Sequence, residues 1–217
     1  GDIILRTIAW SLFVGLISTT IGWTLGVRLA SVQKSIRLGI IAMLLMSLAV
    51  PAYAVFYAWW QVWPSGTWLH GYLVEREMLS VATGCCLAFA LVGWSWPIPA
   101  LIAMMTTKSN TELNMLHRLD GVPMLLRMKQ RVVVDFGAML SSVLLVSALT
   151  AANTTCFDLA QISTIGNELR ATIAMGTSLM QVPSLPVVGF AIALIASMTV
   201  LRLRPTRTRG NEIHHRS

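Results

Sequence analysis

Several uninterrupted apolar runs constrain this chain more than any other feature of its sequence. Long runs begin near Ile3, Leu38, Leu79 and Val132, and a shorter one begins near Leu185. At a rise of about 1.5 Å per residue, roughly 20 residues cross a hydrocarbon core of about 30 Å. Backbone groups in lipid must be hydrogen-bonded within the protein, so these runs predict transmembrane α-helices. The charged fraction of 12% agrees, because soluble domains carry about a quarter.

The fold class predicted from these runs is all-α: a polytopic membrane helical bundle with five core transmembrane helices. The alternating strands of a membrane barrel are not found in the sequence. The five spans are expected at residues 3–26, 38–60, 79–105, 132–152 and 185–201. They form one transmembrane domain over residues 1–204, and residues 205–217 are expected to be a disordered basic tail.

The basic residues predict the orientation of the chain. Of the 16 Lys and Arg residues, all but three lie in the gaps 28–37 and 106–131 or after Leu201. Cytoplasmic loops are enriched in Lys and Arg. These gaps are therefore expected in the cytoplasm, with the N-terminus of this chain outside the membrane and its C-terminus inside. The net charge of +7 then reflects membrane topology and does not indicate nucleic-acid binding.

The sequence gives little support for catalysis, for a cofactor or for a metal site. It has no P-loop motif, and its four His residues are scattered. Cys85, Cys86 and Cys156 are expected to be small apolar fillers. Asp135 is the only acid within an expected span, and we expect it to be solvated at the interface or paired with Arg131. The chain is thus not expected to be an enzyme, and a separate partner would have to drive any uphill transport.

The most polar stretch, "TELNMLHRLDGVPMLLRMKQR" at residues 111–131, begins with the pattern of a short helix. Ser109 and Glu112 form a capping box, in which both side chains bond to free backbone N–H groups. Leu113, Leu116 and Leu119 then recur every three residues and give the helix an apolar stripe.

The same stretch also contains a stop and a restart. Gly121 follows Asp120 and can end a helix, and Pro123 stands where a second helix can begin. The pattern predicts a cytoplasmic helix-turn-helix leading into the fourth span. It fits either a helix that docks on a partner or an amphipathic helix that rests on lipid.

This loop resembles the cytoplasmic loop of the permease subunits of type I bacterial ABC importers. Its "RLDG" core, Arg118 to Gly121, matches that loop best. Counting back from the glycine puts Met115, Leu116 and His117 at the family's E-A-A positions. Met115 replaces the acidic residue there, and Val134 replaces a later proline, so the signature is degenerate.

Other segments extend the resemblance over nearly the whole chain. "AWSLFVGLISTTIGWTLGVRLA", "LAVPAYAVFYAWW" and "WSWPIPALIAMM" are similar to the first three core spans of such permeases. "NTTCFDLAQISTIGNELRATI" resembles an outer segment of iron(III)-type permeases, with Asp158 and Leu159 matching its T-D-L.

The resemblance implies an ATP-driven importer of the bacterial inner (plasma) membrane, in which this chain forms the translocation pathway. Its implied partners are ABC ATP-binding subunits, a second permease half or a homodimer partner, and a periplasmic substrate-binding protein. Iron(III) is the substrate towards which it leans, while sulfate, polyamine and thiamine permeases share the architecture. The residues implied to couple the pathway to the ATPase are Glu112, Leu113, Met115, Leu116, His117, Arg118, Leu119, Asp120 and Gly121.

Two other functions stay open at this point. One is a diverged, non-transporting membrane scaffold that keeps the permease fold, and the other is a polytopic membrane enzyme. The sequence also predicts two packing features. Gly22 and Gly26 form a G-x-x-x-G motif typical of close helix contact, and Pro97 and Pro99 should bend or break the third span.

Overall fold

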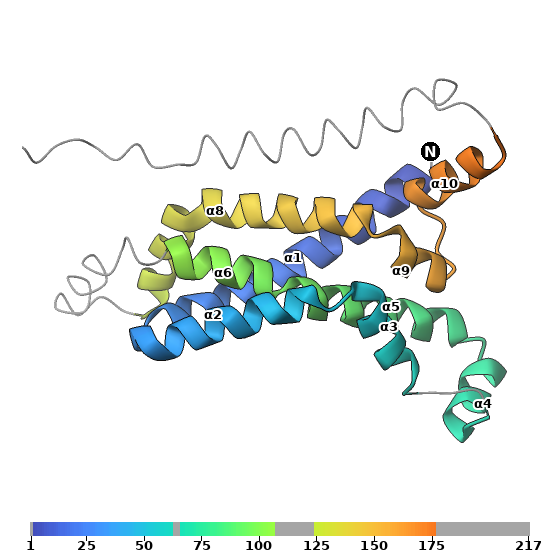
Figure 1. Ribbon diagram of the computed structural model, residues 1–217, viewed down its shortest axis with the longest axis horizontal. Helices are drawn as coiled ribbons and strands as arrows, with labels where there is room; N and C mark the ends of the chain where they lie inside the picture. Colours follow the sequence, from blue (N-terminus) through green and yellow to red (C-terminus); the bar gives the residue numbers. More distant parts are fainter. Residues whose placement is uncertain (1, 63–65, 107–123, 177–217) are drawn as a thin grey trace, which may run out of the picture.

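The computed structural model describes residues 2–62, 66–106 and 124–176, and this part of the chain is all-helical, without a β-strand. Its helices are α1 (Asp2–Ala30), α2 (Lys34–Ala49), α3 (Ala52–Trp60), α4 (Trp68–Glu75), α5 (Leu79–Ser95), α6 (Pro97–Thr106), α8 (Met124–Ala152), α9 (Thr154–Leu159) and α10 (Ile165–Ala174). In Figure 1, α1, α2, α6 and α8 run side by side, and α9 and α10 lie together at one end. We call this the α10 end, and the opposite end, with the α1–α2 turn, the α2 end.

Three stretches are long and apolar enough to cross a membrane: Asp2–Ala30, Leu79–Thr106 and Asp135–Ala152. They coincide with the predicted first, third and fourth spans, and the chain is a helical membrane protein. A fourth candidate exists if α2 and α3 are counted as one broken span. The predicted fifth span, 185–201, and the basic tail, 205–217, lie outside the described residues.

The predicted second span is not one straight helix. Its two halves, α2 and α3, meet at Pro51 and are bent by 78°. Proline has no N–H to continue the helix, and it disfavours the helical conformation in the residue before it. Val50 is accordingly extended, with a ψ of 125°. The indole N–H of Trp94 on α5 donates a 2.9 Å hydrogen bond to the Val50 carbonyl, so one backbone group freed by the break has a partner.

Helix α1 turns most of its small and hydroxyl-bearing residues inward. Its buried residues are Thr7, Ser11, Val14, Gly15, Ser18, Thr19, Gly22, Trp23 and Gly26. Large apolar side chains such as Leu5, Phe13 and Leu16 point outward and are 70%, 48% and 56% exposed. Such a surface suits lipid, where apolar side chains need no burial and small residues let helices approach closely.

The G-x-x-x-G motif of α1 makes the close contact predicted for it. A Cβ atom at Gly22 would overlap the Trp96 carbonyl oxygen, and one at Gly26 would overlap the Ala100 carbonyl oxygen. The backbones of α1 and α6 therefore touch. The prolines have a smaller effect than predicted. Trp96 separates α5 from α6 immediately before Pro97, but its backbone is helical, and Leu79–Thr106 still forms one candidate span.

An apolar core near the α10 end joins several helices. Its buried members include Val14 on α1, Phe56 on α3, Leu87 on α5 and Phe157 on α9. Phe157 also meets the Trp10 ring edge-on, with ring centroids 6.5 Å apart. The short helix α9 is thus fixed to the bundle by its own aromatic side chain.

Candidate functional site

The predicted coupling residues, 112–121, lie outside the described residues. The ends of the chain on either side of them are described. Helix α6 ends at Thr106 and α8 begins at Met124, and both termini lie at the α2 end of the bundle (Figure 1). This end also carries Arg28 and Arg37 near the α1–α2 turn. The connection between α6 and α8 therefore starts and finishes on the basic side of the protein.

A second polar region lies inside the bundle and was not predicted. Its buried side chains come from three helices: Thr7, Ser11, Ser18 and Thr19 of α1, Ser95 of α5, and Ser141, Ser142, Ser147 and Thr150 of α8. Ser18 and Ser95 share a hydrogen bond of 2.7 Å between their hydroxyl groups. Ser141 and Ser142 each donate to a carbonyl one turn earlier in α8, at 2.9 Å.

The contact between α1 and α8 is closest at Gly15. A Cβ atom there would overlap the Ser147 hydroxyl oxygen and would lie 2.8 Å from the Val143 carbonyl oxygen. The absence of a side chain at Gly15 therefore lets α8 rest directly on the backbone of α1. We use the name α1–α8 seam for Gly15 and Ser147, which touch, together with the buried residues Ser11 and Thr19 of α1 and Thr150 of α8.

Asp135 is buried in α8, with 5% of the residue exposed. Of the two sequence-based expectations for it, solvation at the interface is wrong. Asp135 precedes Ser142 by seven residues, two helical turns, so the carboxyl group and that hydroxyl lie on the same side of α8. A buried acid in a membrane helix is a feature associated with function.

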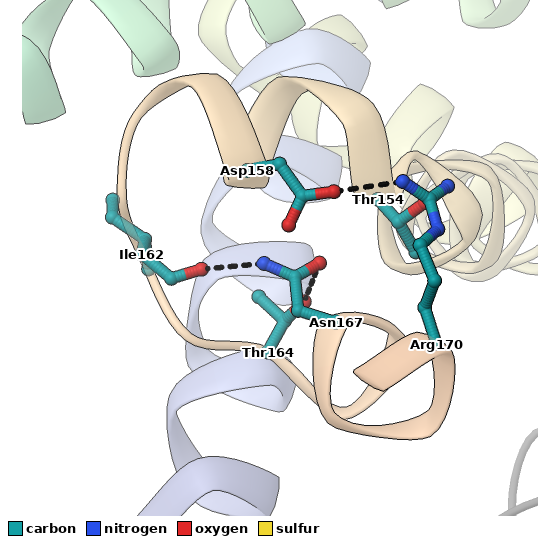
Figure 2. Close-up of polar contacts among 6 residues, drawn as sticks. All are labelled: Thr154, Asp158, Ile162, Thr164, Asn167 and Arg170. Atoms are coloured by element: carbon teal, nitrogen blue, oxygen red, sulfur yellow. Dashed lines mark hydrogen bonds and ion pairs between the residues drawn. The ribbon is translucent and has the colours of Figure 1, made fainter. Parts of the chain in front are cut away.

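At the α10 end, a network of polar side chains joins α9 to α10. Figure 2 shows Arg170 reaching across from α10, where Nη1 donates to Asp158 at 2.8 Å and Nη2 donates to the Thr154 hydroxyl at 2.7 Å. The side chains of Arg170 and Asp158 are 60% and 40% exposed. Exposure limits the strength of such a pair to about 1 kcal/mol, so its role is to orient α10.

Hydrogen bonds between its own residues stabilise the turn between α9 and α10. Asn167 Nδ2 donates to the Ile162 carbonyl, and the Thr164 hydroxyl donates to Asn167 Oδ1, both at 3.1 Å (Figure 2). The Ile165 N–H donates to the Thr7 hydroxyl, at 3.1 Å. The first turn of α10 is therefore attached to the beginning of α1.

The described part of the chain offers no metal centre, since no group of three or more His, Cys, Asp or Glu residues comes together there. Cys156 fills the apolar core, as predicted. Burial raises the pKa of its thiol to about 11, and a hydrogen bond with Asn153 opposes this rise. A thiol with such a pKa is protonated at neutral pH and is a poor nucleophile.

The interior hydroxyls could have been found from the sequence. Thr7, Ser11, Gly15, Ser18 and Gly22 recur every three or four residues, which places them on one face of α1. We predicted only the last part of this stripe, the G-x-x-x-G motif. The missed signal is that an apolar span keeps its glycines and most of its Ser and Thr residues on one side, with Thr20 and Thr24 as the exposed exceptions.

Comparison with protein-family models, curated proteins and solved structures finds no match for this chain. The similarity to importer permeases therefore remains a prediction from the sequence.

Proposed function

We propose that this chain is the membrane subunit of an ATP-driven importer of the ABC type. Residues 109–121 would couple it to a separate ATP-binding subunit. The observation that carries the proposal is the "RLDG" loop placed between two membrane spans. The positions of two helix ends support it. The last residue of α6 and the first residue of α8, between which the loop lies in the sequence, are both at the α2 end, beside the basic α1–α2 turn (Figure 1).

The loop has the chemistry that a coupling element requires. An apolar stripe of Leu113, Leu116 and Leu119 would fill a groove on the ATPase. Charged residues such as Glu112 and Arg118 would set the register of the contact. ATP-driven closure of the partner would then move the spans as rigid bodies between two openings.

The orientation belongs to the same proposal. The α2 end would face the cytoplasm and the α10 end would face outward. A periplasmic binding protein would deliver substrate to the surface formed by α9 and α10. Iron(III) is the substrate class favoured by the resemblance around Asp158. A second copy of the chain or a related permease would complete the pathway.

The test is a matched pair of loop variants. The chain is first purified in mild detergent from its native membrane, and co-purifying proteins are sequenced to identify a P-loop ATPase. Leu116→Glu places a charge on the expected apolar stripe, while Asn114→Glu places the same charge on the opposite face of that helix. Leu116→Glu should lose the ATPase and ATP-dependent uptake in proteoliposomes, and Asn114→Glu should keep both.

A second variant tests transmission without removing apolar contact. Gly121→Val should distort the turn, since glycine at a helix end usually takes a positive φ that β-branched residues tolerate poorly. It should insert normally, keep the ATPase and lose uptake. If Leu116→Glu and Gly121→Val both retain full transport, the coupling role is wrong. Full insertion without any co-purifying ATPase would favour the membrane scaffold, to which Met115 and Val134 already lend some support.

A further inference from the structure

Four hydroxyl groups inside the bundle are buried without a hydrogen-bond partner. They belong to Ser11 and Thr19 on α1 and to Ser147 and Thr150 on α8. These residues are 5%, 2%, 6% and 1% exposed, respectively. Many other helical hydroxyls of the described chain donate to a carbonyl one turn earlier, as Ser141 does. These four do not, and all belong to the α1–α8 seam.

The four hydroxyls lie at neighbouring levels along the seam. The two helices run in opposite directions, since α1 starts at the α10 end and α8 finishes there (Figure 1). Gly15 and Ser147 mark the level at which they touch. Ser11 lies one turn from Gly15 towards the α10 end, and Thr150 lies about one turn from Ser147 in the same direction. Thr19 lies one turn from Gly15 the other way.

The lipid around the bundle cannot supply the missing partners. Hydrocarbon chains neither donate nor accept hydrogen bonds, and the exposed sides of α1 carry large apolar residues. A hydroxyl group both donates and accepts, and water is the smallest ligand that does the same. A bare cation would use only the acceptor capacity of these groups. Their chemistry therefore favours water over an ion.

We propose that the α1–α8 seam is a water-binding site within the membrane, where water bridges the hydroxyls of Ser11 and Thr150 and those of Thr19 and Ser147. The direct contact at Gly15 suits this role. The Ser147 hydroxyl lies there against the backbone of α1, whose N–H groups are already bonded within the helix. A water molecule can therefore hydrogen-bond to the Ser147 hydroxyl without displacing another bond. This inference goes beyond the importer proposal and does not depend on it.

Thiol accessibility tests the site directly. Single cysteines are placed at Ser11 or Ser147 in a background whose native cysteines are alanine, and the protein is reconstituted in nanodiscs without any ATPase. Val14→Cys and Val146→Cys are the controls, because both residues are 0% exposed and belong to the apolar core. A small water-soluble methanethiosulfonate should modify the two seam positions at least about tenfold faster than the controls, since its attack requires a hydrated thiolate. Equal rates at all four positions, slow or fast, would overturn the proposal.

Removing the hydroxyl groups gives an independent readout. Thr150→Val keeps the shape of the side chain, and Ser147→Ala removes a single oxygen atom. In a dry seam, either change deletes an unpartnered polar group and raises Tm. In a seam that binds water, either change breaks a bridged hydrogen bond and lowers Tm. A decrease for both variants supports the site, and an unchanged or raised Tm for both contradicts it.

Discussion

Ser18 donates its hydroxyl proton to Ser95. The two oxygens lie 2.7 Å apart, and the Ser95 hydroxyl donates to the Leu91 carbonyl at 2.6 Å. A serine hydroxyl has one proton. With that proton engaged on Leu91, Ser95 can only accept from Ser18. The bond connects α1 to the end of α5, in the middle of the bundle.

The strength of this bond can be measured with a double-mutant cycle. Ser18→Ala, Ser95→Ala and the double variant are unfolded in mixed micelles. The coupling free energy should be about 0.6 kcal/mol, and at most about 1.7 kcal/mol, the range measured for hydrogen bonds between membrane helices. Ser18→Ala leaves the bond from Ser95 to Leu91 in place, so it should cost less stability than Ser95→Ala. Strict additivity of the two changes would show that no bond connects them.

Gly22→Ala should destabilise the protein strongly. Its Cβ atom would overlap the Trp96 carbonyl oxygen and would lie 2.6 Å from Cγ of Pro99. Overpacking of this kind costs about 1–3 kcal/mol. Gly93→Ala is the control, because a Cβ atom there meets nothing within 4 Å. It should stabilise its helix by about 0.5–1 kcal/mol. Thermal unfolding in detergent should therefore move Tm in opposite directions for the two variants.

Trp94→Phe should loosen the corner between α2 and α3. The variant keeps an aromatic ring and loses the donor to the Val50 carbonyl. A hydrogen bond of this kind contributes about 0.5–1.5 kcal/mol. Hydrogen exchange in the first turn of α3 should accelerate. Trp68→Phe is the matched control, since Trp68 is 82% exposed on α4 and its loss should leave exchange in α3 unchanged. Equal hydrogen exchange in the two variants would mean that the bond from Trp94 to the Val50 carbonyl does not stabilise the bend between α2 and α3.

Cys156 should resist alkylation until the pH is strongly alkaline. Burial raises the pKa of its thiol from 9.0 to about 11, so the neutral thiol is favoured in the folded state. Two pKa units lower the thiolate fraction roughly a hundredfold. The stability from the neutral thiol is present below the unfolded pKa and is lost as the pH rises through about 11. Maleimide labelling near pH 8 should be about a hundredfold slower at Cys156 than at an exposed cysteine such as Ser163→Cys.

The orientation of the bundle can be tested with an impermeant thiol reagent on intact cells. In a background without the three native cysteines, Ser163→Cys near the α10 end should react from outside, and Ser35→Cys in α2 should react only after lysis. Both serines are exposed. Gly166 is a poor reporter, because a Cβ atom there would overlap the Thr154 side chain. Reversed labelling would place the α2 end outside and remove the basis for a cytoplasmic coupling loop.

The main helices of the fold could be predicted because their signal is local. Hydropathy over about 20 residues is enough to find a span, and it found α1, the α5–α6 pair and the apolar part of α8. The bend at Pro51 was missed even though the proline was visible. A proline inside an apolar run can either kink a helix slightly or break it, and the outcome depends on partners such as Trp94 that only the fold brings close.

The polar sites depend on contacts over long distances in the sequence. Nothing near Ser18 indicates that it meets Ser95, and nothing near Asp158 indicates that Arg170 reaches it. Asp135 stands one turn inside an expected span, and its surroundings in the sequence suggested solvation. Its burial follows from the packing of α8 against other helices, which the sequence of α8 alone does not determine.

The inward-facing side of α1 has a consequence for biosynthesis. Ribosomes add about 5–20 residues per second, so Ser95 emerges 77 residues after Ser18, roughly 4–15 s later. Helix α8 follows later still. During this interval, α1 carries glycines and hydroxyls on one side with none of the helices that will cover them. The newly made helix must therefore wait beside the insertion machinery or in lipid until α5 and α8 are synthesised. If their insertion is delayed, the uncovered side of α1 can pack against helices of other proteins.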